Sequence, residues 1–160
     1  MIQIKSSTGG PAGASGCTCS KLRRLTRRVT AVYDRTLAAA GMRVTQYSLL
    51  SHLRGTQGMP MSQLAQTLDM DRTTLTRNIK PLLEAGWVKV QPGSDDARVR
   101  LVYLTLAGAE QWETARSYWR QAQKEVNATI GAQNLTELHQ MLDACVPLFR
   151  PAAGTDGGPE

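Results

Sequence analysis

Apolar residues recur at helical spacing through the first third of the chain. Between residues 20 and 40 they lie on a single stripe, which consists of Leu22, Leu25, Val29, Val32, Tyr33, Leu37 and Ala40. Such a stripe predicts an amphipathic helix, and Gly41 is a suitable residue to end it. A second helix is expected to begin with Thr45 as its cap and to run through Leu53, where the segment "GTQGMP" breaks the pattern.

Two short helices joined by a tight turn are predicted next. Ser62 is a suitable cap for the first helix and Asp71 for the second, because both side chains can accept a hydrogen bond from a helix N-terminus. Only Asp69 and Met70 separate the two helical patterns, which leaves room for a turn and nothing longer. This arrangement is typical of a helix-turn-helix.

Residues that favour β-strands replace the helical pattern after Gly86. The segments "WVKV" and "VRLVYL" flank "QPGSDDAR", which predicts a β-hairpin with a charged tip. Thr105 is then expected to cap a long amphipathic helix, and Asn134 a last helix whose apolar stripe places Cys145 in the core. The predicted fold class is mostly α with a small β-hairpin wing, a winged helix-turn-helix with long helices on both sides.

These patterns divide the chain into one domain and two terminal segments. We expect a domain over residues 17–150, with the winged helix-turn-helix over about residues 45–104 and long helices over about 20–40 and 105–149. Gly-rich sequence predicts a flexible arm over residues 1–16 and a flexible tail over residues 151–160. The arm contains no apolar segment typical of a secretion signal, and no stretch approaches a membrane span. We therefore expect a cytoplasmic protein that does not bind membranes.

Charge is distributed unevenly along the chain. The net charge is +6, and residues 20–43 carry seven basic residues against Asp34 alone. Residues 101–160, in contrast, carry seven acidic and four basic residues. A basic region of this kind favours a polyanionic partner, with the acidic half facing away from it.

The helix after Asp71 has two different faces. At about 100° per residue, one face carries Leu75, Ile79, Leu82 and Leu83, and the opposite face carries Thr73, Arg77 and Lys80 with Thr74 beside them. Arg can donate two hydrogen bonds to guanine, and Thr offers a hydroxyl and a methyl group to base edges. Pro81 lies late in this helix, where it predicts a kink or a tightened last turn.

Double-stranded DNA is the partner that this helix predicts. The N-terminal part of the second helix of a helix-turn-helix meets the bases. The base-contact candidates are Arg72, Thr73, Thr76 and Arg77. Asn78 and Lys80 are candidates for phosphate contacts, and Thr74, Ser62 and Gln63 complete the set assigned to DNA binding.

Two stretches together resemble the MarR family of bacterial transcriptional regulators. They are "SQLAQTLDMDRTTLTRNIKPLLEAGWV" and the wing "DDARVRLVYLTLAG", and the resemblance covers roughly residues 20 to 149. It implies a homodimer joined by the long terminal helices, a pseudo-palindromic operator, and regulation of a nearby operon as a repressor. In the wing, Arg98 matches the family's minor-groove Arg and Asp96 the residue that holds it, while Arg100 is expected to contact phosphate.

The resemblance also implies a small-molecule effector, often an aromatic or other anion, held between the terminal helices and the winged part. Tyr33, Tyr47, His52 and Trp112 are residue types that could line such a pocket, although aromatic residues at helical spacing more often form core. A second candidate for anion binding is the cluster formed by Arg23, Arg24, Arg27 and Arg28. The effector-binding residues stay open at this point.

Four further hypotheses concern other chemistry or another kind of partner. Cys17 and Cys19 lie beside basic residues that could lower a thiol pKa, so a redox-sensing regulator is one alternative. Cys17-Thr18-Cys19 is too closely spaced for a zinc site and has no second Cys/His pair, so we expect no metal and no cofactor. No set of catalytic residues is recognisable, since His52 and His139 stand alone, which argues against an enzyme. A winged helix used to bind another protein is the remaining alternative.

Overall fold

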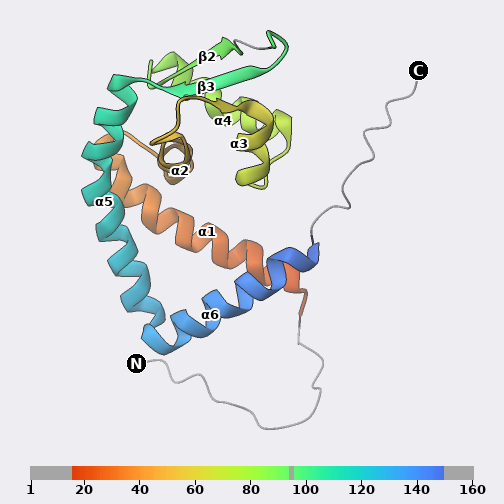
Figure 1. Ribbon diagram of the computed structural model, residues 1–160. Coiled ribbons are helices and arrows are strands. Elements are labelled where there is room, and N and C mark those ends of the chain that lie inside the picture. Colours follow the sequence, from red (N-terminus) through yellow and green to blue (C-terminus); the bar gives the residue numbers. More distant parts are fainter. Residues whose placement is uncertain (1–15, 94–95, 150–160) are drawn as a thin grey trace.

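A computed structural model describes residues 16–93 and 96–149 of the 160-residue chain. Long helices form one part of the molecule, and short helices with a small sheet form the other (Figure 1). The helices are α1 (Thr18–Leu37), α2 (Val44–Leu53), α3 (Met61–Thr67), α4 (Arg72–Glu84), α5 (Leu106–Ile130) and α6 (Ala132–Cys145), with short 3₁₀ helices η1 (Ala38–Ala40) and η2 (Val146–Phe149). The strands are β1 (Met59–Pro60), β2 (Val88–Pro92) and β3 (Arg100–Leu104).

The helix-turn-helix and the wing form one continuous unit. Helices α2, α3 and α4 pack beside the sheet, and α5 leads away from the sheet to α6 (Figure 1). Helix α1 packs along α5, so the two long helices support the winged part from one side. The predicted fold class, mostly α with a hairpin wing, is confirmed.

The sheet has one strand more than the sequence pattern predicts. Strands β2 and β3 form the expected antiparallel hairpin, with Val88 opposite Leu104 and Pro92 opposite Arg100. Strand β1 pairs with the other side of β3, where Met59 lies opposite Val102. We expected only a break in the helix over "GTQGMP", because a strand of two residues is too short to show an alternating pattern.

Two of the predicted helix caps are confirmed. The Asp71 side chain accepts a hydrogen bond from the backbone N–H of Thr74 at the start of α4. The Thr105 hydroxyl accepts one from the N–H of Gly108 at the start of α5. Gly41 also ends its helix as expected, in a left-handed conformation with φ of 64°.

Three predicted caps are wrong. Helix α2 begins before Thr45, since the Asp34 side chain of α1 accepts a hydrogen bond from the N–H of Val44 at 2.8 Å. Helix α3 begins at Met61, with Pro60 rather than Ser62 at the cap position. Helix α6 begins directly after Gly131, and the Asn134 side chain instead donates to the carbonyl of Ile130 at the end of α5.

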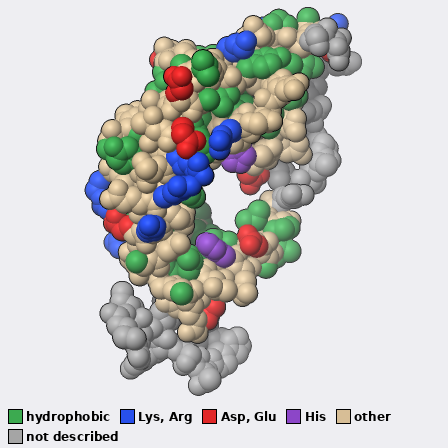
Figure 2. All heavy atoms as spheres, turned by 60° about the vertical axis from the view of Figure 1, so that its left-hand side comes forward, with side chains coloured by type: hydrophobic (Ala, Val, Ile, Leu, Met, Phe, Trp, Pro, Cys, Tyr) green, Lys and Arg blue, Asp and Glu red, His purple; other side chains and the backbone are tan. Residues whose placement is uncertain are grey.

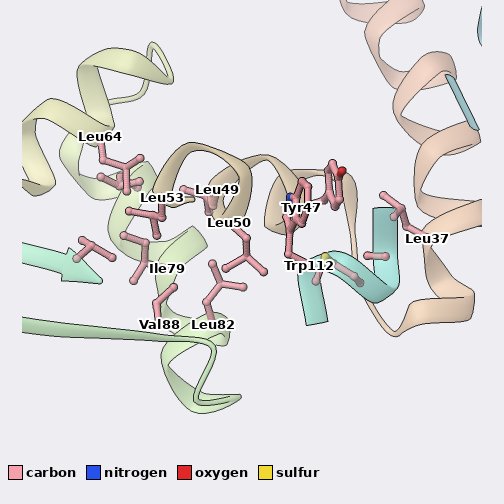
Figure 3. Close-up of a cluster of buried hydrophobic side chains, with 14 of the residues drawn as sticks. Leu37, Tyr47, Leu49, Leu50, Leu53, Leu64, Ile79, Leu82, Val88 and Trp112 are labelled. Carbon is pink, nitrogen blue, oxygen red and sulfur yellow. The ribbon is translucent and has the colours of Figure 1, made fainter. Parts of the chain in front are cut away.

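Helix α2 lies at the centre of the hydrophobic core. Its Leu49, Leu50 and Leu53 are at most 1% exposed, and they belong to one cluster with Ile79 and Leu82 of α4 (Figure 3). Val88 of β2 and Leu64 of α3 belong to the same cluster. The winged part is therefore built around α2, and burial of these side chains stabilises it.

Two residues expected in the core lie at the surface. Leu83 is 41% exposed, although Leu75, Ile79 and Leu82 on the same face of α4 are buried. Cys145 is exposed because α6 contributes no buried residue to this single chain. A helical stripe identifies the apolar face, but the width of the contact decides which residues of the stripe are buried.

Within the part of the chain that is described, no helix is long and apolar enough to cross a membrane.

The central position of α2 predicts that the core is sensitive to truncation there. Leu50→Ala should lower the free energy of unfolding by about 2 to 5 kcal/mol, because it leaves a cavity in a fully buried site. Leu106→Ala is the matched control, since Leu106 is 79% exposed and its truncation should change stability by less than about 0.5 kcal/mol. Urea unfolding followed by circular dichroism measures both, and equal losses would contradict this description of the core.

Candidate nucleic-acid interface

Helix α4 exposes one side of its surface and buries the other. Leu75, Ile79 and Leu82 are at most 2% exposed and hold the helix against the core. The side chains on the other side all reach solvent: Arg72, Thr73, Thr74, Thr76, Arg77 and Lys80. The predicted division of this helix is therefore present in the structure, apart from the exposure of Leu83.

The first turn of α4 is fixed by Asp71. One carboxylate oxygen accepts a hydrogen bond from the Thr74 backbone N–H at 2.8 Å, and the other accepts one from the Thr74 hydroxyl at 2.7 Å. These hydrogen bonds hold the pKa of Asp71 below its ordinary value, so the carboxylate stays charged and the cap is lost only under acid conditions. The Thr74 hydroxyl thus serves the cap, and the Thr76 hydroxyl donates to the carbonyl of Arg72.

Asn78 and Pro81 lie beyond the first turn of α4. Asn78 is half-buried, and its amide nitrogen lies 3.6 Å from the sulfur of Met70 in the turn between α3 and α4. Pro81 does not end the helix, since α4 continues to Glu84 and the N–H of Ala85 donates to the Pro81 carbonyl. Lys80 remains exposed, with its ammonium 3.8 Å from Glu84.

The wing is held in shape by Asp96. Its side chain accepts a hydrogen bond from the backbone N–H of Arg98 at 2.9 Å, and its carbonyl accepts one from the N–H of Val99. The N–H of Gly93 donates to the Val99 carbonyl across the hairpin. Asp96 therefore orders the backbone beneath Arg98 and leaves the Arg98 side chain exposed.

One cavity joins the helix-turn-helix to the wing. It has a volume of about 830 Å³ and lies between α3, α4 and the strands of the wing. Six of the predicted DNA-contact residues line it: Ser62, Arg72, Thr76, Lys80, Arg98 and Arg100. The remaining candidates, Gln63, Thr73, Thr74, Arg77, Asn78 and Asp96, lie outside its lining.

Gln66 lines the same cavity and was not among the residues predicted from sequence. It lies on α3 four residues after Ser62, and both side chains are exposed. Residues four apart share a face of a helix, so this spacing could have identified Gln66. The apolar floor, which includes Met61 and Val90, brings together elements far apart in sequence and carries no such signal.

The aromatic residues considered for effector binding are packed against one another. Tyr47 stacks on Trp112 at a ring separation of 5.6 Å, and both side chains are less than 9% exposed. Nδ1 of His52 lies 2.8 Å from the carbonyl of Ser48, and the Tyr33 hydroxyl donates to Gln123. These contacts place the aromatic residues in the packing of α1, α2 and α5.

Basic side chains gather at two other places. Figure 2 shows Lys and Arg side chains collected near the middle of one face, with acidic side chains beside them. Arg54 and Arg116 both approach the Trp112 ring and both pair with Glu113, at 3.9 and 3.0 Å. The cluster formed by Arg23, Arg24, Arg27 and Arg28 lies exposed on α1.

Cys17 has an environment that favours its thiolate. It is exposed at the N-cap position of α1, and Cys19 is exposed one residue into the helix. Hydrogen bonds from the Ser20 backbone and hydroxyl, and from the Cys19 backbone, lower the pKa of the Cys17 thiol. Among residues 16–93 and 96–149, the structure contains no group of three His, Cys, Asp or Glu side chains that could hold a metal ion.

Comparisons with known proteins point to one family. The model of the MarR family matches residues 42–99. The crystal structure of the transcriptional regulator MosR of M. tuberculosis with DNA is 34% identical, has a TM-score of 0.68, and is similar over 82% of this chain and 99% of that chain. The transcriptional activatory protein BadR of Rhodopseudomonas palustris is 31% identical over 128 aligned positions, and the match covers 75% of this chain and 73% of BadR.

Matches to two Bacillus subtilis regulators are shorter. YdgJ, an HTH-type transcriptional regulator, is 28% identical over 96 residues, 60% of this chain. The chain spans 58% of YdgJ and 53% of the second Bacillus regulator. The similarity therefore extends over most of BadR and MosR but over little more than half of these two relatives.

The environment of Cys17 predicts a shifted pH dependence of alkylation. In a Cys19→Ser, Cys145→Ser background, iodoacetamide should label Cys17 with a midpoint pH below that of an unstructured cysteine peptide, because hydrogen bonds favour the thiolate. Ser20→Ala should move the midpoint part of the way back, since it removes the hydroxyl but keeps the backbone donor. Identical midpoints for the protein and the peptide would refute the assignment.

Proposed function

Because this chain belongs to the MarR family of transcriptional regulators, we propose that it is a homodimer that binds double-stranded DNA and represses a nearby operon. The observation that carries the proposal is the shared surface of α4 and the wing. There, exposed Arg72, Lys80, Arg98 and Arg100 surround one cavity. Cations that converge from two elements favour a polyanion, and DNA offers them base edges, a minor groove and phosphates.

In this proposal, α4 enters the major groove with its N-terminal half. Arg72, Thr73, Thr76 and Arg77 meet base edges, while Lys80 and Arg100 neutralise phosphates. Four further residues lie around this contact and bind the sugar-phosphate backbone of the DNA: Thr74, Ser62, Gln63 and Asn78. Arg98, on a hairpin ordered by Asp96, enters the minor groove, where the negative potential is strongest.

Exposed apolar residues at both ends of the chain support a homodimer. On α1, Leu22 is 46% and Leu25 42% exposed, and in α6 and η2 the large apolar side chains are exposed as well: Met141, Leu142, Val146, Leu148 and Phe149. Apolar surface of this extent is rare on a monomer unless it binds a partner. A two-fold dimer presents two α4 helices to half-sites about one helical turn apart, so we propose a pseudo-palindromic operator.

A small molecule is proposed to release the protein from DNA. In a structural neighbour, BpsR of Bordetella bronchiseptica, DNA binding is regulated by 6-hydroxynicotinic acid. An aromatic or other anionic effector fits the basic surface of this chain.

The direction of regulation is tested with a reporter gene under the promoter beside this gene. Deletion of the protein should raise expression, whereas a fall would make it an activator, like the transcriptional activatory protein BadR.

Thiol-based sensing is a second candidate, and the environment of Cys17 favours it. The thiolate of Cys17 attacks a peroxide, which leaves a sulfenic acid and releases water or an alcohol. The Cys19 thiol then condenses with that sulfenic acid to a disulfide and releases a second water. Two thiols are oxidised and one peroxide is reduced. Loss of DNA binding on peroxide treatment that disappears in Cys17→Ser would support this candidate, whereas the same loss in Cys17→Ser would remove it.

The DNA proposal is tested by removing one arginine at a time. DNA is selected from a random library with the wild-type protein, and Arg77→Ala and Arg98→Ala are then measured on the selected sequence. Each should weaken binding by about 1 to 3 kcal/mol, because each removes a base or groove contact. Lys124→Ala is the matched control, since it removes one positive charge from an exposed position of α5 and should bind almost as the wild type does.

Salt dependence separates this function from a protein-binding winged helix. A protein that neutralises phosphates releases counterions, so its affinity for DNA must fall steeply as salt rises. Weak binding that does not respond to salt, together with wild-type affinity of both arginine variants, would overturn the proposal.

A further inference from the structure

Three aromatic rings form a column between the winged part and the long helix α5. Tyr47 of α2 lies between Trp112 and Trp119 of α5, with ring centroids 5.6 Å away on both sides. The interplanar angles are 12° and 15°, so all three rings are nearly parallel. Figure 3 shows Tyr47 and Trp112 side by side at the edge of the core.

The spacing of the tryptophans matches the thickness of this stack. Trp112 and Trp119 are seven residues apart, which corresponds to two turns or about 10.5 Å along a helix. One ring inserted between them needs nearly the same distance, given two separations of 5.6 Å. Tyr47 therefore acts as a knob in a hole on α5, and a shift of one helical turn, about 5.4 Å, would remove it from the hole.

Further contacts hold each end of the column. Trp112 donates its indole N–H to the Ser51 hydroxyl at 2.7 Å, and that hydroxyl donates to the Tyr47 carbonyl at 2.8 Å. The guanidinium carbon of Arg54 lies 4.1 Å from the centre of the Trp112 ring. At the other end, Trp119 contacts the ring of Tyr33 on α1, at a centroid distance of 6.5 Å.

Helix α2 transmits this position to α4. Leu49, Leu50 and Leu53 follow Tyr47 on α2 and pack in one buried cluster with Ile79 and Leu82 of α4. Because protein cores deform little, α4 keeps its orientation to α2 and hence to α5. Helix α5 leads to α6, which carries exposed apolar residues at the other end of the molecule.

We propose that the column formed by Tyr47, Trp112 and Trp119 is a positioning device that sets the distance between the two α4 helices of the dimer. It selects the separation of the operator half-sites and does not read bases. This inference rests on the proposed function, because the separation has meaning only for a dimer on DNA. Tyr47, Trp112 and Trp119 are positioning residues in this scheme, since they act on DNA through α4.

The test measures affinity against half-site separation. The probes are duplexes that carry two copies of the half-site selected with the wild-type protein, with centre-to-centre separations that increase by one base pair. The wild type should bind best at one separation. In Tyr47→Leu and Trp119→Leu, affinity at that separation should fall about tenfold. Their affinity for a single half-site should stay the same, and the optimum should broaden or move.

Two controls separate positioning from general loss of stability. Tyr47→Phe keeps the ring and should keep the wild-type optimum. Leu64→Ala leaves a cavity in the buried core of α3, away from the column, and should lower stability without moving the optimum. Trp119 is only half-buried at the end of the column, so Trp119→Leu decides the question if Tyr47→Leu does not fold.

The outcomes for this inference and for the proposed function differ. If the wild type binds none of the duplexes, the proposed function fails. If the wild type shows a sharp optimum that Tyr47→Leu and Trp119→Leu retain, the proposed function stands and the column has no positioning role. A wild type that binds all separations equally would also overturn the inference.

Discussion

The packing of α4 on α2 is the contact on which the rest of this molecule depends. Leu75, Ile79 and Leu82 of α4 are buried against a core centred on α2, and burying each of them contributes roughly 1.5 to 3 kcal/mol. With one side held in this way, the other side is free to carry residues chosen for their chemistry. Thr73, Thr76 and Arg77 lie on this exposed side. Threonine is a poor helix former, and it is tolerated there because the buried side holds the helix in place.

Side-chain hydrogen bonds support α4 at its start, where its residues are poor helix formers. Asp71 binds both the backbone and the hydroxyl of Thr74, so the first turn is closed before any partner arrives. The wing follows the same principle, because Asp96 orders the backbone of Arg98 while the side chain stays exposed. In both elements a carboxylate accepts a hydrogen bond from a backbone N–H. The neighbouring arginine side chain therefore stays exposed and can bind a polyanion. Preorganisation of this kind lowers the entropy lost on binding.

Sequence patterns predicted what depends on local period, and they missed what depends on tertiary contacts. Every long helix and the hairpin were found, as were the caps Asp71 and Thr105, whose side chains bond within their own turn. Thr45 was wrong because Asp34, ten residues away from Val44, caps α2 from another helix. The two faces of α4 were predicted almost completely. The cavity that joins α4 to the wing was not, since α3, α4 and the hairpin meet only in the folded chain.

An alanine scan of residues 72–84 tests the central claim, that one side of α4 holds the helix and the other side binds DNA. For each variant, the free energy of unfolding and the affinity for selected DNA are measured together. We predict two separate sets: Leu75, Ile79 and Leu82 lose stability, whereas Arg72, Thr73, Thr76 and Arg77 lose DNA affinity at unchanged stability. Losses of stability and affinity that fall on the same residues would contradict the account.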